Sequence, residues 1–228
     1  GFADLMNQTS VEIGLKNTHF VNSTGLPHPD HFSTAYDLNR LTRTIIQEQP
    51  VHYAYYAIPA FTWNEITQKN RNPLLARDEN VDGVKTGYTK SAGYCLIGSA
   101  ERSGTRLIAT VIGASSERER ANLVYALLKY GFAAYESHRL YGGDTVVVTV
   151  RIFKGKTDSV PAGISQGIDL LLAKGLGEEL EAKVQLAEPL VAPIEKGHEV
   201  GTLTLQLNGE PLLSRQLVSL DSVPSGSW

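Results

Sequence analysis

The stretch "VDGVKTGYTKSAGYCLIGSAERSGTRLIATVIGA", Val81 to Ala114, decides the fold of the first part of this chain. From Gly83 onward it contains three runs, "GVKTGYT", "GYCLIGSAER" and "TRLIATVIGA", with the β-branched and apolar content of strands. Ser103-Gly104 joins the last two runs, and such a dipeptide indicates a tight turn between antiparallel strands. The stretch therefore predicts a sheet whose first strand carries the triplet Lys85-Thr86-Gly87.

A helix is predicted directly after this sheet, within residues 115–137. Ser116 and Glu119 have the spacing of a capping box, which satisfies free backbone N–H groups at a helix start. Apolar residues recur along one face of the predicted helix, as they do on a helix that covers a core. They are Ala121, Val124, Leu128 and Phe132.

Two more helices are predicted before the sheet. Residues 1–15 read as the tail of a helix, because their apolar residues lie near helical spacing. Residues 34–49 predict a second helix, capped by Ser33 or Thr34. If Thr34 is the cap, Asp37 falls where its carboxylate suits a capping box and the positive end of the helix.

The region between the second helix and the sheet carries no regular pattern. Residues 60–80 are polar and are predicted to be irregular, with "NRNPLL" as a loop. An aromatic run is predicted to pack beneath a loop; its members are Tyr53, Tyr55, Tyr56 and Phe61.

The pattern changes near Gly142-Gly143, where alternation of apolar and polar residues begins. It is visible in "TVVVTVRIF", "LEAKVQLAE" and "GTLTLQLNGEPLLSRQLVSL", and Asn208-Gly209 is a strong hairpin signal. We therefore expect two domains, one of mixed helix and strand over residues 1–141 and a mostly β one over residues 142–228.

Composition excludes several classes of protein. Apolar residues are 42% and charged residues 20% of the 228, which fits neither a disordered chain nor a collagen or disulfide scaffold. The net charge of −3 and the absence of a basic run argue against nucleic-acid binding. No run approaches the roughly 20 apolar residues of a membrane-spanning helix, and no signal peptide is visible.

Two single residues add expectations. Cys95 is the only cysteine, which rules out an internal disulfide, and its apolar surroundings predict a buried core position. The chain starts at Gly1 without Met, which suggests a processed, cut or incomplete polypeptide.

The triplet Lys85-Thr86-Gly87 is the strongest candidate for chemistry. An edge strand can pair its free backbone groups with an extended peptide. The lysine would supply positive charge, the threonine hydroxyl would bind an anion, and the glycine would permit close approach. A Lys-Thr-Gly triplet also arises by chance, so a polar strand end without a function is the alternative.

Three segments resemble one known family. "GLKNTHFVNSTGLPHPDHFSTAYDL", "NRNPLL" and the stretch from Val81 to Ala114, in this order, resemble the D-alanyl-D-alanine carboxypeptidases, low-molecular-mass penicillin-binding proteins of bacteria. The resemblance implies a partial penicillin-binding/β-lactamase-like transpeptidase domain of α/β (α+β) class, followed by a mostly β C-terminal domain. It covers nearly the whole chain.

The family uses three motifs, S-x-x-K, S-x-N and K-T-G. Only the third occurs here, so the chain looks like the family without its first third, and the nucleophile and general base are expected outside residues 1–228. Family members usually end in an amphipathic helix that lies on the membrane surface. This sequence stops at "VPSGSW", so that helix is expected outside it as well.

The resemblance also implies roles for single residues. Lys85 would hold the hydrogen-bond network of the site and assist proton transfer, and Thr86 would bind the carboxylate of the terminal D-alanine. Gly87 would leave room for it, and Tyr88 would offer its backbone N–H as half of an oxyanion hole. Arg120 would support carboxylate recognition, since a planar guanidinium suits two oxygens.

Other residues have competing interpretations. Arg71 could shape the edge of the site or be structural, and Arg120 could be a solvated residue beside Glu117 and Glu119. Asp37 is expected to be only a cap partner. "HPDH" hints at metal ligands, but Pro29 and the missing third ligand favour a polar loop. Its polar members are His28, Asp30 and His31.

The function implied is that of a serine-type peptidase, which removes the terminal D-alanine from peptidoglycan stem peptides through an acyl-enzyme and is inhibited by β-lactams. No metal or organic cofactor is implied. The expected location is the periplasm, peripheral to the cytoplasmic membrane. One alternative is a non-catalytic peptide-binding or scaffolding protein of the cell envelope. Another is a β-lactamase, which fits less well because β-lactamases lack the β-rich second domain.

Overall fold

The computed structural model describes residues 1–187 and 189–226. These residues form two compact units, Gly1–Ala134 and a second that begins at Tyr135. The division lies a few residues before Gly142, where the sequence pattern changes, because Tyr135–Tyr141 forms a strand, β6, of the second unit.

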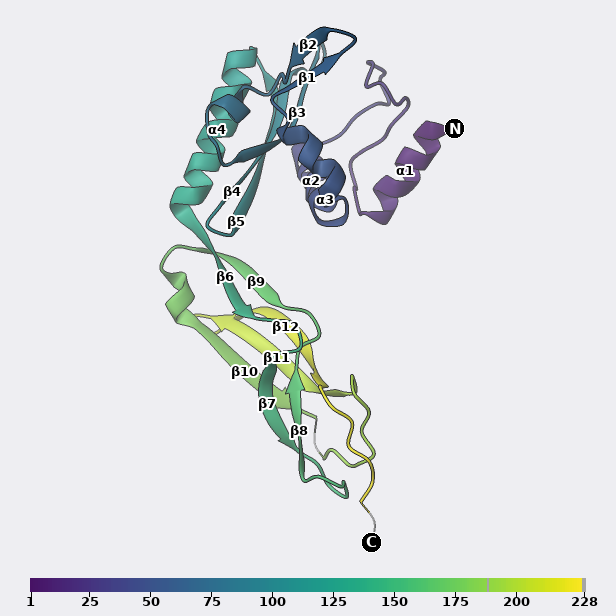
Figure 1. Cartoon of the computed structure of the whole chain (residues 1–228), viewed down its shortest axis with the longest axis vertical. Helices are drawn as coiled ribbons and strands as arrows, with labels where there is room; N and C mark the ends of the chain where they lie inside the picture. Colours follow the sequence, from purple (N-terminus) through teal and green to yellow (C-terminus); the bar gives the residue numbers. More distant parts are fainter. Residues whose placement is uncertain (188, 227–228) are drawn as a thin grey trace. The chain divides into compact units, whose positions relative to one another are not determined.

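The first unit is built on a three-stranded antiparallel sheet of order β3-β4-β5 (Figure 1). Its strands are β3 (Val81–Thr89), β4 (Gly93–Arg102) and β5 (Thr105–Ala114). Ser103 and Gly104 both have positive φ, 48° and 76°, as a tight hairpin turn between strands requires. The predicted sheet and its turn are confirmed.

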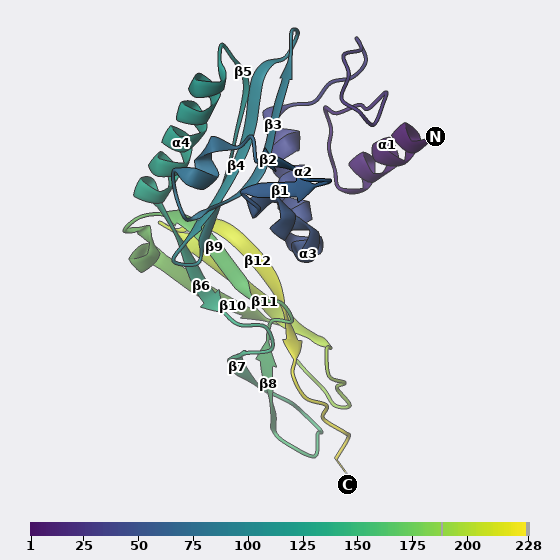
Figure 2. The same cartoon turned by 45° about the horizontal axis from the view of Figure 1, so that its top comes forward.

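Helix α4 (Glu117–Ala134) covers one face of this sheet, and helix α2 (Ala35–Glu48) lies on the other face, as Figures 1 and 2 both show. The predicted apolar face of α4 is confirmed: Ala121, Val124 and Leu128 are buried in one core cluster with residues of the sheet. On the opposite face, Thr110 Oγ1 of β5 donates to Asn39 Oδ1 of α2 at 2.6 Å.

The start of α4 differs in detail from the prediction. Ser116 Oγ accepts a hydrogen bond from the Glu119 N–H at 3.1 Å, which is one half of a capping box. The Glu119 carboxylate accepts from the N–H and Oγ of Ser115, at 2.6 and 2.5 Å, and not from Ser116. The reciprocal half is therefore displaced by one residue.

Helix α1 (Phe2–Glu12) confirms the predicted helix tail. Thr34, one of the two caps that the sequence allowed, is the cap of α2, but Asp37 is more than its partner. The Asp37 carboxylate is fully buried and accepts from the Asn17 N–H and from Thr18 Oγ1, both at 2.7 Å. It therefore ties the preceding loop to α2, and the expectation of a cap role alone was wrong because the loop folds back over the helix start.

Helix α2 stops before Pro50, which starts a short helix α3 (Pro50–Tyr53) that leads into a 3-10 turn η1 (Ala54–Ala57). The expectation of an irregular segment after it was wrong in part. Residues 60–69 form a hairpin of β1 (Ala60–Trp63) and β2 (Ile66–Lys69), followed by a 3-10 turn η2 (Pro73–Ala76). All strand residues of the hairpin are exposed, so no buried face marks it in the sequence.

Two packing predictions need correction. Tyr53 is buried and Tyr56 packs against it, with ring centroids 5.8 Å apart, but Tyr55 and Phe61 are 64% and 63% exposed. Cys95 is half-buried and not a core residue. It lies near the start of β4, where its Sγ donates to the Ala92 carbonyl at 3.4 Å.

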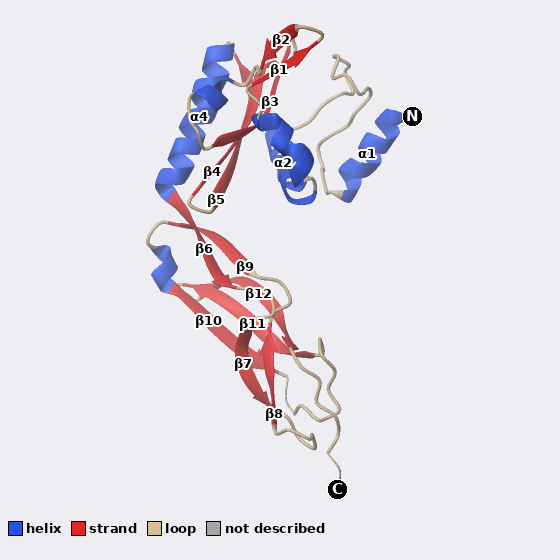
Figure 3. Ribbon diagram, viewed as in Figure 1, coloured by secondary structure: helices blue, strands red, loops and turns tan. Residues whose placement is uncertain are grey.

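The second unit is mostly β, as predicted, and its strands are drawn in red in Figure 3. β6 pairs with β9 (Ile168–Ala173), and a five-stranded sheet has the order β10-β11-β12-β8-β7. A short 3-10 turn η3 (Leu176–Glu179) precedes β10. The strands of that sheet are β7 (Val146–Arg151), β8 (Ser159–Gly163), β10 (Leu180–Leu186), β11 (Glu199–Leu207) and β12 (Glu210–Ser219).

The hairpin predicted at Asn208-Gly209 is confirmed, since both residues have positive φ between β11 and β12. The strands predicted within residues 145–153 and 201–220 are also present. The run predicted over residues 180–188 forms β10, but its last residue, Glu188, lies outside the described residues. Within residues 1–187 and 189–226, no helix has the length and apolar content needed to cross a membrane.

Candidate functional site

The Lys85-Thr86-Gly87 triplet lies in β3, at the edge of the sheet. Among the described strands β3 pairs with β4 alone, so the backbone groups along its other edge are free of strand partners. Successive side chains of a strand point to opposite faces. Thr86 is opposite Leu96 and therefore faces α4, whereas Lys85 is opposite Ile97 and faces α2.

The two side chains differ in exposure. Thr86 is 8% exposed, and Lys85 is exposed, with its ammonium donating to the Thr86 carbonyl at 2.7 Å. The triplet thus places a charged group on one face of an open strand edge and a hydroxyl on the other.

Arg120 supports β3 from the α4 side. The residue is 3% exposed, and its Nη1 donates to the carbonyl oxygens of Gly87 at 3.0 Å and of Cys95 at 3.4 Å. The contact with the exposed Glu117 carboxylate is longer, at 3.6 Å. Arg120 is therefore not a solvated residue of the helix start: it is buried and holds the backbone of the triplet.

An aromatic layer continues from Arg120 to the strand edge. The Arg120 guanidinium lies 5.6 Å from the centre of the Tyr94 ring, within the range of a cation–π contact. Tyr94 is directly opposite Tyr88, and their ring centres are 4.3 Å apart. The exposed Tyr88 ring is thus held in place at the end of β3.

The two glycines of β3 serve different needs. A Cβ on Gly83 would lie 2.8 Å from Tyr53 Oη, so packing requires glycine there. A Cβ on Gly87 would meet only the Cys95 Cβ, at 3.9 Å, which is an ordinary contact. The folded chain does not need glycine at position 87, and the space beside it is open to a group from outside.

A loop anchored by two asparagines presents Arg71. Asn70 Nδ2 donates to the Tyr56 and Ile58 carbonyls, at 3.1 and 3.0 Å. Asn72 is buried, and its Nδ2 donates to the Gly83 carbonyl of β3 at 2.9 Å. Arg71 lies between them, exposed, and makes no hydrogen bond or ion pair with any described residue. It is a free positive charge on a loop that is fixed to the start of β3.

A polar cluster that was not predicted from the sequence lies beneath the start of β3. Tyr53 Oη donates to Asp82 Oδ1 at 2.7 Å, and Arg106 Nη1 lies 2.7 Å from Asp82 Oδ2. Arg106 Nη1 also donates to Ser99 Oγ at 2.9 Å. Burial and the neighbouring carboxylate raise the pKa of the Tyr53 hydroxyl above its ordinary value, so it stays a donor. No sequence pattern predicts this cluster, because its residues are far apart in the chain and come together only through strand register.

The "HPDH" segment forms local loop contacts. His28 Nδ1 accepts from the Asp30 N–H, and His31 Nδ1 accepts from the Val21 N–H, both at 3.2 Å. In the part of the chain that the structure describes, no three His, Cys, Asp or Glu side chains gather as a metal site would require.

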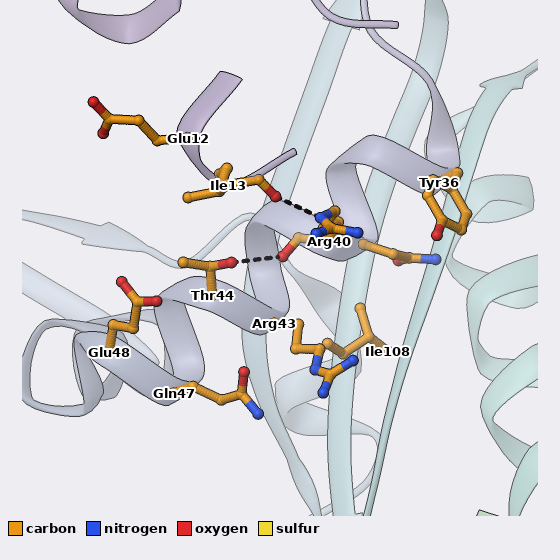
Figure 4. A pocket seen from close by; sticks show the side chains of 10 residues that line it. Glu12, Ile13, Tyr36, Arg40, Arg43, Thr44, Gln47, Glu48 and Ile108 are labelled. Atoms are coloured by element: carbon orange, nitrogen blue, oxygen red, sulfur yellow. Dashed lines mark hydrogen bonds between the residues drawn. The ribbon is translucent and has the colours of Figure 1, made fainter. Parts of the chain in front are cut away.

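A pocket of about 600 Å³ lies away from these residues, between the end of α1, α2 and Ile108 of β5 (Figure 4). Arg40 of α2 donates to the Ile13 carbonyl across it, and Thr44 Oγ1 donates to the Arg40 carbonyl at 3.2 Å. The pocket contains no residue that the sequence marked for chemistry. We place the candidate site at β3 because charge, hydroxyl, open backbone and free space meet there.

Each of the two units matches a known protein family. Residues 1–116 match the peptidase S11 family, described as D-alanyl-D-alanine carboxypeptidase. Residues 135–225 match the family described as penicillin-binding protein 5, C-terminal domain.

Curated relatives align over the whole chain. D-alanyl-D-alanine carboxypeptidase DacC of Escherichia coli (strain K12) is 39% identical over 229 residues, which cover 100% of this chain and 57% of the relative. DacF of Bacillus subtilis (strain 168) is 38% identical over 239 residues, covering 100% of this chain and 60% of the relative. The chain thus spans less than two thirds of the length of these relatives.

A solved structure gives the same result. Penicillin-binding protein 5 from Haemophilus influenzae superposes with a TM-score of 0.88 at 34% identity, covering 98% of this chain and 66% of that one. The resemblance inferred from the sequence is confirmed. With its first unit matched to peptidase S11 and its second to a penicillin-binding protein domain, the chain belongs to the D-alanyl-D-alanine carboxypeptidase family.

Proposed function

We propose that this chain forms one wall of the active site of a serine-type D-alanyl-D-alanine carboxypeptidase that acts on peptidoglycan stem peptides. The observation that carries the proposal is the Lys85-Thr86-Gly87 triplet on an open strand edge, with Gly87 unobstructed and Arg120 buried behind it. The names of the relatives agree with this reaction.

In the proposed reaction the end of the stem peptide lies along the free edge of β3 as an added strand. Thr86 Oγ donates to the terminal carboxylate, and Arg71 supplies positive charge near it. Arg120 holds the Gly87 carbonyl and so fixes the strand against which the substrate lies. The Tyr88 N–H donates to the oxygen that becomes negative in the transition state.

The covalent step needs a serine and a base from an S-x-x-K motif, which residues 1–228 lack. Because the relatives are longer than this chain, we assign that motif to the rest of the natural protein. The serine Oγ attacks the carbonyl, the C–N bond to the last D-alanine breaks, and the leaving amine takes the serine proton. Lys85 assists this transfer, and water then hydrolyses the ester to free the serine and the shortened peptide.

The proposal extends to inhibitors and location. β-Lactams would acylate the same serine, and their carboxylate would bind where that of D-alanine binds. The substrate lies outside the cytoplasmic membrane, so the protein would work in the periplasm, attached to the membrane surface by a helix after residue 228. No observation favours the non-catalytic peptide-binding alternative, and the match of the second unit argues against a β-lactamase.

The test uses the natural full-length protein. We expect incubation with benzylpenicillin to add the mass of one penicillin, and a peptide ending in D-Ala-D-Ala to lose one D-alanine. A folded protein that shows neither an adduct nor D-alanine release would refute the proposal.

Variants of Thr86 make this test specific for the site. We expect Thr86→Val, which removes the hydroxyl but keeps the shape, to lower kcat/KM for D-alanine release about ten- to hundredfold, the usual effect of losing a hydrogen bond to a charged group. Thr86→Ser keeps the hydroxyl and should retain most of the activity. Equal loss in both variants would mean that the methyl group, and not the hydroxyl, matters.

A further inference from the structure

The β1–β2 hairpin exposes an apolar face that the proposed reaction does not use. Phe61 is opposite Gln68 and Trp63 is opposite Ile66, so all four side chains lie on the same face of the hairpin. Phe61, Trp63 and Ile66 are 63%, 75% and 62% exposed. A contiguous exposed apolar surface of this kind marks an interaction site.

A pocket lies at the base of this face. Its volume is about 470 Å³, within the range of small-ligand sites. Tyr55 and Phe61 contribute exposed aromatic rings to the lining, and Gln68, which is opposite Phe61, contributes a side-chain amide. Gln68 makes no side-chain hydrogen bond within the described residues, so its amide is available to a ligand.

Hydrogen bonds of one short chain segment link the pocket to the strand of the candidate site. Asn70 lines it and is fixed to the Tyr56 and Ile58 carbonyls. Two residues further on, Asn72 is bonded to the Gly83 carbonyl of β3. Figures 1 and 2 both show the hairpin beside β3. A polymer whose peptide branch lies along β3 could therefore reach the pocket with its adjoining part.

We propose that this pocket binds a sugar ring of the glycan to which the stem peptide is attached, an inference that rests on the proposed function. A sugar ring has an apolar C–H face and a rim of hydroxyl groups. The aromatic rings of Phe61 and Tyr55 match the face, and the amide of Gln68, on the same face of the hairpin as Phe61, matches the hydroxyl groups. The protein would thus distinguish glycan-attached stem peptides from free ones.

The charges of the hairpin argue against a lipid surface as the occupant. Segments that lie on membranes combine apolar residues with several lysines or arginines. The tip of this hairpin is Asn64-Glu65, next to Trp63, and Lys69 is the only basic residue in residues 60–69.

Trp63 lies two residues from Phe61 on the same face of the hairpin, so its fluorescence can report binding in the adjacent pocket. The sequence has two tryptophans, so Trp228→Phe makes Trp63 the only one. We would titrate this chain with a disaccharide-peptide released from peptidoglycan by a muramidase, and with the free peptide of the same sequence. We expect the disaccharide-peptide to change Trp63 fluorescence and to bind about tenfold more tightly, the usual effect of one aromatic contact.

Two variants show where the sugar binds. Phe61→Ala should abolish the difference in affinity between the two ligands, and Tyr36→Ala, which removes a 72% exposed aromatic ring from α2, should preserve it. If the disaccharide-peptide and the free peptide bind with equal affinity, and Phe61→Ala changes neither affinity, the proposal is overturned. A Trp63 response to phosphatidylglycerol vesicles with none to the disaccharide-peptide would also overturn it.

Measurements of D-alanine release distinguish a failure of the sugar site from a failure of the proposed function. In the natural full-length protein, Phe61→Ala should leave D-alanine release from free pentapeptide unchanged and lower kcat/KM for the disaccharide-pentapeptide. If Phe61→Ala still releases D-alanine from both substrates and leaves the ratio of their kcat/KM values unchanged, the sugar site alone is refuted. Absence of any release, with sugar-dependent binding retained, would refute the proposed function alone.

Discussion

Two arginines near β3, Arg120 and Arg71, differ in burial and in hydrogen-bond partners. Arg120 is buried, and its Nη1 already donates to the Gly87 and Cys95 carbonyls. Arg71 is exposed and has no hydrogen-bond or ion-pair partner among the described residues. Burial and these two hydrogen bonds make Arg120 a support of the strand, whereas the guanidinium of Arg71 is accessible to a ligand.

This difference predicts opposite effects of two substitutions. Arg120→Ala leaves two carbonyls without their donor and should lower the free energy of unfolding by about 2–3 kcal/mol. Arg71→Ala should change it by less than about 0.5 kcal/mol, as exposed substitutions do, yet lower kcat/KM in the full-length protein. Urea unfolding and D-alanine release measure the two effects. Equal stability losses would contradict the assignment.

Asp37 should make stability depend on pH. Burial alone would raise the pKa of its carboxyl, but hydrogen bonds from Thr18 and Asn17 outweigh burial and hold the pKa below its usual range. Because the pKa in the unfolded chain is about 3.9, the ionised carboxylate stabilises the fold above that pH. This contribution is lost as the pH falls through the lowered pKa of the folded state.

We therefore expect Asp37→Asn to unfold at lower urea concentration than the wild type at pH 7, with the difference narrowing at pH 3. Paired urea titrations at the two pH values measure it. A difference of the same size at both would show that the carboxylate charge is not the cause.

At the scale of elements, the contact of α4 with the sheet depends in part on Gly98. A Cβ on Gly98 of β4 would lie 2.5 Å from Val124 Cγ1 of α4 and 3.4 Å from Leu74 Cδ1. Helix and sheet can approach this closely only because the strand has no side chain at that point. The same helix carries Arg120, so its distance from β3 also sets the support of the triplet.

We expect Gly98→Ala to lower the free energy of unfolding by about 1–3 kcal/mol, because α4 must shift. Val124→Ala in the same chain should remove the clash, so the double variant should be more stable than the sum of the single effects predicts. Gly87→Ala is the matched control and should cost little stability, since its Cβ has free space. Additive effects at positions 98 and 124 would refute the clash.

At the scale of the whole molecule, each unit has a core of its own. Leu74 belongs to the cluster that joins α4 to the sheet of the first unit. Leu217 belongs to a separate cluster in the second unit. Both side chains are fully buried, so each unit has apolar burial that does not depend on the other's residues.

Two cores predict two unfolding transitions in calorimetry of this chain. Leu74→Ala and Leu217→Ala should each remove about 2–5 kcal/mol from one unit. Each variant should therefore lower the midpoint of one transition and leave the other in place. A single transition that both variants lower equally would show that the units unfold together.

The sequence by itself determined the three-stranded sheet, its Ser103-Gly104 turn, the apolar face of α4 and the mostly β second unit. It also showed the family, through the triplet and its neighbouring segments. These features follow from residue types at short, regular spacing, and such spacing acts locally through backbone preference and the alternation of buried and exposed faces.

Only the tertiary structure decided which arginine is free, that Asp37 anchors a loop, and that residues 60–69 form an exposed hairpin. It alone joined Tyr53, Asp82 and Arg106 into one cluster. The physical reason is that the state of a charged side chain depends on partners distant in sequence. Strand register and the packing of α4 bring those partners within hydrogen-bond distance, and no local pattern records them.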